Sequence, residues 1–508
     1  MEFIPNADML NGALSLLFQP KVLIWLVVGL ISGFIVGAIP GFNDTNFLAM
    51  VLPFTVYLGP MQAVIFMMAV FCGSQTAGSI PAILVNIPGT PSNAPTTLEG
   101  FALTRQGRAG EALGCSLFSS TMGGLSGSII CLLLAPIIGI YALKFGPAEI
   151  CAMAIFGMSA VGSLTGRSIS KGLVSSLLGL LLATIGTEME LGRMRSTFGF
   201  YELAEGFPLI PVLLGAFGFS EVLSLVQEEY IISDRAVFRF RGYASLFQGM
   251  RESLRYKLSM LRSAIIGVLV GLVPGVGAAV ATWISYGQAR AWSKTPEKFG
   301  TGHYEGLVAT DTCNNGVTGG ALIPTMTLGI PGSGTTVVVM AALMINGIQP
   351  GPSLFMNFQQ EAYAIFFSLF LSNVLMFLVG LVVMRFLPLV TYVPTRILAP
   401  IMALFCLVGG LAWRGFVFDM ILVFFFGLLG LVMKRNGYST PALVLAVILG
   451  PIAEKNLIWS LKIGGPAIFL RPISLGILLA TVGAIFVPVF IRKIARSGVA
   501  DRVTGSGE

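Results

Sequence analysis

One pattern restricts the fold of this chain more than any other: two prolines seven residues apart in an apolar stretch, followed by glycine and small hydroxyl residues. The pattern occurs twice, in Ser79–Pro95 (SIPAILVNIPGTPSNAP) and in Ala321–Thr336 (ALIPTMTLGIPGSGTT). A Pro-Gly pair removes a backbone donor and lets the chain turn, so each stretch should interrupt a helix. Inside a membrane such a break survives only where protein surrounds it or where it lines a wet cavity. We therefore expect both stretches to lie inside the protein and to offer polar groups to an ion or a substrate.

Long zones without charge surround both stretches. No charged residue occurs between Asp44 and Glu99, and none occurs between Asp311 and Glu361. Glycine and proline are common in membrane helices, and this alone is the alternative explanation of the pattern. It does not explain why the pattern recurs in a matching setting.

A second signature stands upstream of each stretch, Gly37-Ala-Ile-Pro40-Gly41 in the first half and Gly271-Leu-Val-Pro274-Gly275 in the second. The second half has gained residues between its signatures, most simply in the polar stretch 288–303. Broken apolar segments at matching positions of two halves indicate the binding site of a secondary transporter. The sequence thus predicts one unit that has been duplicated.

The composition places this unit in a membrane. Hydrophobic residues make up 55% of the 508 residues and charged residues only 10%, whereas about 25% are charged in ordinary soluble domains. Roughly ten to fourteen apolar stretches approach the length of about 20 residues that crosses a bilayer. We predict an all-α polytopic membrane protein with broken helices or re-entrant hairpins at its Pro-Gly motifs. The net charge of +7 resides in loops, so it should mark orientation rather than a nucleic-acid partner.

We predict two membrane repeats, residues 1–227 and 263–508, separated by a basic cytoplasmic linker at 228–262; the second repeat includes the C-terminal helices and a short basic tail. An acidic N-terminus outside and the basic linker inside would give the two pseudo-symmetric repeats inverted topology. The apolar spans share high hydropathy and low charge, and we expect them at Val22–Ile39, Phe47–Phe71, Ala112–Ile140, Ala148–Leu164, Leu173–Ile185, Phe207–Val226, Ser263–Ala281, Ala362–Met384, Ile397–Leu411, Phe416–Met433, Leu443–Ile452 and Ile473–Ile491.

Polar clusters border both charge-free zones at their N-terminal ends. Hard cations take carboxylate and amide oxygens, so these clusters are predicted to hold a coupling cation. The residues of this predicted ion site are Pro40, Gly41, Asn43, Asp44, Asp311, Asn314 and Asn315. An ordinary exposed loop is the alternative for the first cluster.

Two further predictions concern single residues. The six cysteines lie singly without the paired spacing of metal ligands, so we expect small packing residues rather than disulfides or ligands. Arg414 and Asp419 flank an apolar span. Interface anchors are favoured over a buried pair there, because charge inside a membrane is costly.

The duplicated signatures, their spacing and the frame Gly319–Gly334 (GGALIPTMTLGIPGSG) resemble the large membrane subunit of bacterial tripartite tricarboxylate transporters, the TctA family. The resemblance covers nearly the whole chain. It implies a multi-pass protein of the bacterial inner membrane that takes up citrate or related carboxylates. It also implies a small four-helix membrane subunit, a periplasmic solute-binding protein and an ion gradient, commonly sodium, as partners and driving force. No cofactor beyond the sodium ion is expected.

A tricarboxylate is anionic, yet the charge-free zones contain no Arg or Lys to pair with it. Backbone amides and the positive end of a helix remain, where the chain restarts as a helix after each Pro-Gly break. The predicted substrate site accordingly consists of Pro88, Gly89, Thr90, Ser92, Asn93, Pro331, Gly332, Ser333, Thr335 and Thr336.

Other classes of function fit the sequence less well. A primary pump needs a nucleotide site, and the chain has no Gly-x4-Gly-Lys-Ser/Thr motif. An enzyme would need a nucleophile with its base or a metal cluster, for which one histidine and few intramembrane acids are poor material. A passive or differently coupled channel for small organic anions is the alternative to a carrier, although no ring of repeated filter sequence is present.

Overall fold

Helices make up nearly all of the computed structural model, which describes residues 7–39, 42–165, 168–188, 192–226, 242–386 and 395–485. The chain forms two compact units, residues 1–143 with 210–429 and residues 144–209 with 430–508, called here unit 1 and unit 2. Both predicted Pro-Gly stretches belong to unit 1.

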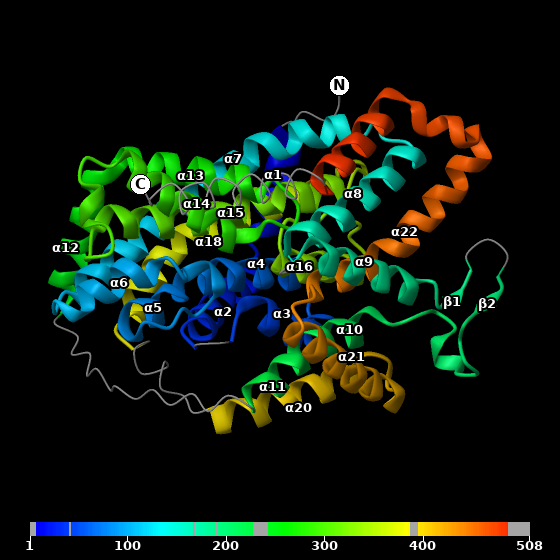
Figure 1. The fold of residues 1–508 in the computed structure, drawn as a ribbon, viewed down its shortest axis with the longest axis horizontal. Helices are drawn as coiled ribbons and strands as arrows, with labels where there is room; N and C mark the ends of the chain where they lie inside the picture. Colours follow the sequence, from blue (N-terminus) through cyan, green and yellow to red (C-terminus); the bar gives the residue numbers. More distant parts are fainter. Residues whose placement is uncertain are drawn as a thin grey trace, which may run out of the picture. The chain divides into compact units, whose positions relative to one another are not determined.

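The elements of unit 1 follow one another along two segments of the chain (Figure 1). In the first segment they are α1 Ala7–Leu17, α2 Pro20–Gly37, α3 Asp44–Thr55, α4 Pro60–Ala77, α5 Ser79–Val85, the short 3-10 helix η1 Pro91–Asn93, α6 Thr96–Arg105 and α7 Ala109–Ala142. In the second they are α10 Leu209–Leu213, the π-helix η3 Leu214–Phe219, α11 Ser220–Leu225, α12 Tyr243–Ser253, η4 Leu254–Tyr256, α13 Lys257–Gly271, α14 Gly277–Trp292, η5 Pro296–Lys298, α15 Tyr304–Leu328, α16 Gly334–Ile345, α17 Leu354–Asn357, α18 Gln359–Val383, α20 Thr395–Arg414 and most of α21 Val417–Arg435.

Unit 2 contains fewer elements. They are α8 Pro147–Thr165, α9 Ile169–Ala183, the strands β1 Gly186–Thr187 and β2 Met194–Arg195, η2 Tyr201–Leu203, α22 Thr440–Gly464, η6 Pro466–Leu470 and an apolar helix at Pro472–Ile485. The strands pair antiparallel, with Gly186 opposite Arg195. This hairpin follows α9 in the sequence and precedes η2 and α10.

The predicted fold class, an all-α polytopic membrane protein, is confirmed. By length and composition, seven described helices can cross a membrane: Pro20–Gly37, Pro60–Val85, Ala109–Ala142, Gln359–Val383, Ile397–Arg414, Val417–Arg435 and Thr440–Gly464. Five further apolar helices in the described residues are only 10–17 residues long. Several of the predicted spans therefore appear as short helices, because breaks divide them.

The order of elements around the two pairs of signatures is alike. A helix, a break and a short helix (α2, α3) precede the first double-proline stretch, and α13 and α14 precede the second in the same way. Small residues let α2 pack closely on α4: a Cβ on Gly37 would lie 2.4 Å from the Ser74 carbonyl oxygen. Likewise, a Cβ on Gly267 of α13 would lie 2.5 Å from the Cys313 carbonyl oxygen of α15. Inverted symmetry of the two repeats stays a prediction.

The predicted linker at 228–262 is described only from residue 242 onward, where it forms α12, η4 and the start of α13. The division of the sequence into repeats at this linker stays a prediction. All six cysteines are buried with free thiols, as expected of packing residues. Arg414 and Asp419, expected as separate interface anchors, form an ion pair of 2.6 Å at the turn between α20 and α21, and Asp419 is fully buried.

Candidate functional site

Each double-proline stretch ends a helix in the same way. Pro81 cannot donate a hydrogen bond to Ala77, and the helix is interrupted there between α4 and α5. One turn later the left-handed Asn86 (φ 59°) ends α5, and its amide bonds to the Pro81 carbonyl. In the second half, Gly329 (φ 69°) ends α15 and bonds to the Pro324 carbonyl. The first proline of each pair thus supplies the carbonyl that receives the helix cap.

The two stretches differ in how the chain restarts. In the second half α16 begins directly, because Ser333 accepts from the Thr336 amide and Thr336 returns a bond to the Ser333 amide, forming a capping box. In the first half a 3-10 turn, η1, comes before α6 begins at Thr96. After Pro88-Gly89 the chain therefore restarts as a helix by way of this 3-10 turn.

Backbone contacts hold both breaks against the upstream signatures. A Cβ on Gly89 would lie 2.1 Å from the Gly37 carbonyl oxygen, and one on Gly332 would lie 2.8 Å from that of Gly271. The amide of Gly275 donates to the Gly332 carbonyl at 3.2 Å. Only glycine leaves room for these two approaches, which explains the Pro-Gly pair in each double-proline stretch. Pro40 and Gly41, which belong to the predicted ion site, lie outside the described residues.

The first polar cluster begins α3 and is not an exposed loop. The Asn43 side chain accepts from the Asn46 amide at 3.0 Å and caps the helix. Asp44 is 3% exposed, and its Oδ2 accepts from Gln75 of α4 at 2.9 Å and from Thr335 of α16 at 3.0 Å. The alternative of an ordinary solvated loop is thus wrong, and the carboxylate binds groups from both halves.

A continuous series of hydrogen bonds leads from Gln75 through residues 90–93 of the first double-proline stretch. The Ser92 hydroxyl donates to Gln75 Oε1 at 2.9 Å and lies 2.8 Å from the Thr90 hydroxyl. Thr90 donates to the side-chain oxygen of Asn93. The Asn93 amide nitrogen in turn donates to the Ser79 hydroxyl at 2.7 Å. Three predicted substrate residues therefore connect the region of Asp44 to α5.

This series of hydrogen bonds ends at Asp311, which lies in α15 and is completely buried. Its Oδ1 accepts from Ser79 at 2.9 Å and from Thr96, the first residue of α6, at 2.8 Å. Its Oδ2 has no hydrogen-bond partner among the described residues; Ser116 of α7 is adjacent but not in hydrogen-bonding geometry. Asp44 begins a helix whereas Asp311 lies within one, so the two carboxylates have different local settings.

Further bonds connect the halves next to this chain. Asn314 donates to the Gln75 carbonyl at 3.0 Å, and its Oδ1 has no described partner. Thr76 donates to the Asn315 side chain at 3.2 Å. The structure thus brings together, within unit 1, most of the predicted ion site, residues 90–93 of the first double-proline stretch, and Thr335.

The fully buried carboxylate of Glu99 holds a segment next to this site in place. Glu99, one turn after Thr96 in α6, accepts four hydrogen bonds. They come from the Tyr286 hydroxyl of α14 (2.8 Å) and from the amides of Gly300 (2.6 Å), Gly302 (2.9 Å) and His303 (2.7 Å). The polar insertion between α14 and α15 is therefore fastened to the helix that presents Thr96 to Asp311.

Four residues of this arrangement had no predicted role: Gln75, Ser79, Thr96 and Glu99. Gln75 and Ser79 stand four residues apart in an apolar segment, and such spacing places two polar side chains on one helix face. That periodicity is a signal in the sequence. No such signal exists for Thr96 or Glu99, since their partners come from the second half.

This chain is similar in sequence to known proteins. The sequence model of the family described as "Tripartite tricarboxylate transporter TctA family" matches residues 23–445. An uncharacterized 52.8 kDa protein in the TAR-I ttuC' 3' region of Agrobacterium vitis is 32% identical over 457 residues, which cover 90% of this chain and 90% of that protein. An uncharacterized protein in the TAR-II ttuC' 3' region of the same organism is 30% identical over 191 residues, 38% of this chain and 79% of that protein.

Proposed function

This chain belongs to the tripartite tricarboxylate transporter TctA family, and we propose that it is a secondary active carrier that imports citrate or a related carboxylate, driven by sodium. As a member of that family it is a membrane component of a transporter. The observation that carries the proposal is the single hydrogen-bonded chain from Asp44 to Asp311, built from both halves in a zone without Lys or Arg.

Sodium coupling is supported by the oxygen acceptors of this series of hydrogen bonds. Two buried carboxylates lie in it, and Asp311 Oδ2 and Asn314 Oδ1 accept no described hydrogen bond. Carboxylate and amide oxygens are ligands that hard cations prefer. An anionic substrate would be repelled by the two carboxylates unless a cation were bound with it. Coupling thus follows from charge: the cation supplies the potential that the anion requires.

The substrate would meet the start of α16. The capping box uses the amide of Thr336, and the first-turn amides of Gly334 and Thr335 have no acceptor within the helix. Such amides and the helix dipole favour an anion. The Thr335 hydroxyl also contacts Asp44, so a cation at Asp44 would be next to the bound carboxylate.

The family implies the remaining parts of the transporter. We include in the proposal a small four-helix membrane subunit, a periplasmic binding protein that delivers the carboxylate, and the bacterial inner membrane as location. Expression with and without each partner, followed by uptake measurements, tests these assignments separately.

The decisive experiment uses proteoliposomes that contain the chain, its small subunit and the cognate binding protein. Labelled citrate and other carboxylates are offered with an inward sodium gradient, with equal sodium on both sides, and without sodium. A carrier accumulates label above the external concentration only in the first case. Equilibration that stops at equal concentrations, whatever the sodium gradient, would show a channel and refute the proposal.

A further inference from the structure

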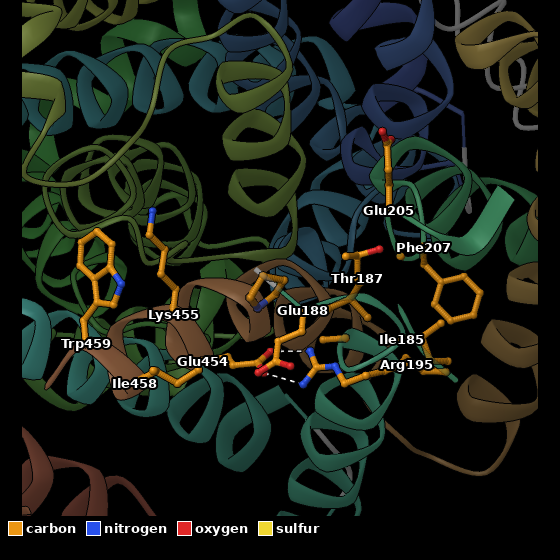
Figure 2. A pocket seen from close by; sticks show the side chains of 15 residues that line it. Ile185, Thr187, Glu188, Arg195, Glu205, Phe207, Glu454, Lys455, Ile458 and Trp459 are labelled. Carbon is orange, nitrogen blue, oxygen red and sulfur yellow. Dashed lines mark hydrogen bonds and ion pairs between the residues drawn. The ribbon is translucent and has the colours of Figure 1, made fainter. Parts of the chain in front are cut away.

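A pocket of about 450 Å³ lies in unit 2, whereas the candidate site belongs to unit 1. Figure 2 shows its lining, which comes from the end of α9, the β1–β2 hairpin with the residues that follow it, and one face of α22. This volume is within the range of small-molecule sites, about 300 to 1,000 Å³. The pocket takes no part in the function proposed above.

One wall of the pocket is apolar and belongs to membrane helices. Val447, Pro451, Ile458 and Trp459 follow the helical period along α22, a candidate span, and Leu182 of α9 contributes to the lining. Trp459 is 46% exposed. An exposed tryptophan near the end of an apolar span is typical of the membrane–water interface. An occupant with an apolar part beside a polar group fits this wall.

The polar part of the lining carries both signs of charge. Arg195 and Glu454 form a bidentate pair, with distances of 2.7 and 3.1 Å (Figure 2). Beyond this pair, Glu188, Glu205 and Lys455 make no ion pair or side-chain hydrogen bond with the described residues. The Lys455 ammonium lies 4.8 Å from the centre of the Trp459 ring. The lining therefore holds three carboxylates against two cations, with groups of both signs left to bind a ligand.

A further donor in the lining is unused. The Nε–H of Arg195 is buried and has no described hydrogen-bond partner. An acceptor such as a phosphate or ester oxygen would satisfy it, and phosphate oxygens would also accept from Lys455. The carboxylates of Glu188, which is half-buried, and Glu205, which is exposed, suit the opposite partner, a cation that donates hydrogen bonds.

We propose that this pocket binds the zwitterionic head group of phosphatidylethanolamine, with its acyl chains along the apolar face of α22. The primary ammonium would donate to Glu188 or Glu205, and the phosphate would accept from Lys455. A quaternary ammonium has no N–H to donate, so phosphatidylcholine should bind less well. A purely anionic head group or a free carboxylate would meet a lining with an excess of negative charge.

Fluorescence quenching by brominated lipid tests this proposal without any transport assay. The full chain is placed in nanodiscs of phosphatidylcholine with a minor fraction of one brominated lipid, and the Trp459 signal is the difference between the chain and W459F. Brominated phosphatidylethanolamine should quench this signal at about a tenth or less of the content that brominated phosphatidylcholine or phosphatidylglycerol requires, as expected for one charge-assisted hydrogen bond.

Matched variants identify the groups responsible. The double change Glu188→Gln and Glu205→Gln should reduce the preference to that of phosphatidylcholine. Lys455→Gln should weaken quenching by all three lipids, because each of them has a phosphate. Glu297→Gln, an exposed carboxylate of η5 in unit 1, should leave it unchanged. Equal quenching by all three lipids, stronger quenching by phosphatidylglycerol, or a preference that survives the double change would overturn the proposal. Displacement of the lipid by citrate would identify a carboxylate site instead and would also overturn it.

Discussion

Replacing Glu99 by Gln changes almost no volume but removes the charge that fastens the α14–α15 insertion. The carboxylate has two oxygens, and each accepts two of the four bonds from Tyr286, Gly300, Gly302 and His303. A glutamine side chain keeps one oxygen and presents an NH2 group where the other was. With its NH2 group toward Gly302 and His303, the glutamine faces two amide donors. With the NH2 group toward Tyr286 and Gly300, it faces the Gly300 amide, while the Tyr286 hydroxyl can turn to accept.

The loss can be estimated from these contacts. A hydrogen bond to a charged group contributes about 1.5 to 3 kcal/mol. In the better orientation of the glutamine one such bond is lost and the other three no longer involve a charge, so E99Q should destabilise the fold by roughly 3 to 5 kcal/mol after allowing for non-additivity. Tyr286→Phe removes one bond and leaves the charge satisfied by three amides, so its cost should be about 1.5 kcal/mol. Glu297→Gln, on the exposed η5 of the same insertion, should stay within about 0.5 kcal/mol.

Hydrogen exchange with mass spectrometry on the detergent-solubilised chain measures this directly. The peptide containing Gly300, Gly302 and His303 should lose protection in E99Q, keep most of it in Y286F and be unchanged in E297Q. Because Thr96 lies one turn before Glu99 and donates to Asp311, E99Q should also raise the sodium concentration needed for half-maximal uptake. If these amides stay protected in E99Q, the carboxylate does not hold the insertion and the reasoning is wrong.

The other predictions follow from the same contacts. Asp44→Asn and Asp311→Asn should each raise the sodium concentration for half-maximal uptake by roughly tenfold, the effect of about 1.4 kcal/mol, before they weaken substrate recognition; sodium activation that is unaltered in both would contradict the ion assignment. Ser333→Ala should weaken substrate binding by roughly two- to tenfold, since one neutral donor contributes about 0.5 to 1.5 kcal/mol, and tritiated-substrate binding to the reconstituted transporter measures it. Burial lowers the pKa of His303, so the unfolded state binds more protons and stability should fall as pH drops through about 6.5. Thermal unfolding of His303→Phe, which can still stack on Phe299, should lack this decline.

Much of the fold follows from patterns that are local in the sequence. Apolar length and sparse charge predict α2 and α7 to within a few residues, and the prolines indicate where α5 and α15 end. Errors arise where short breaks were overlooked. The apolar stretch 47–71 was expected to be continuous, but Gly59 and Pro60 divide it, because proline at the first turn begins α4.

For the candidate site, less could be predicted from the sequence than for the fold. Asp44 and Asp311 could be selected from the sequence because each borders a charge-free zone. Their burial and their partners could not, since Thr335 reaches Asp44 from 291 residues away and Ser79 reaches Asp311 from 232. Contacts of this kind depend on how the two halves pack, and local periodicity contains no information about it.

The series of hydrogen bonds that connects Asp44 to Asp311 has a property that appears only when its hydrogen atoms are counted. A hydroxyl has one hydrogen to donate. Ser92 uses its hydrogen on Gln75 and Thr90 uses its own on Asn93, yet the two hydroxyl oxygens lie 2.8 Å apart. With both carboxylates ionised, one contact in the chain therefore always lacks a hydrogen. Turning the Asn93 amide only moves this vacancy toward Ser79, whose hydrogen is directed at Asp311.

The vacancy resembles an orientational defect in ice. Rotation of the Ser92 hydroxyl toward Thr90, or of the Thr90 hydroxyl toward Ser92, moves it to the neighbouring contact. One added positive charge, a proton on a carboxylate or a metal ion between the oxygens, fills it and fixes one arrangement.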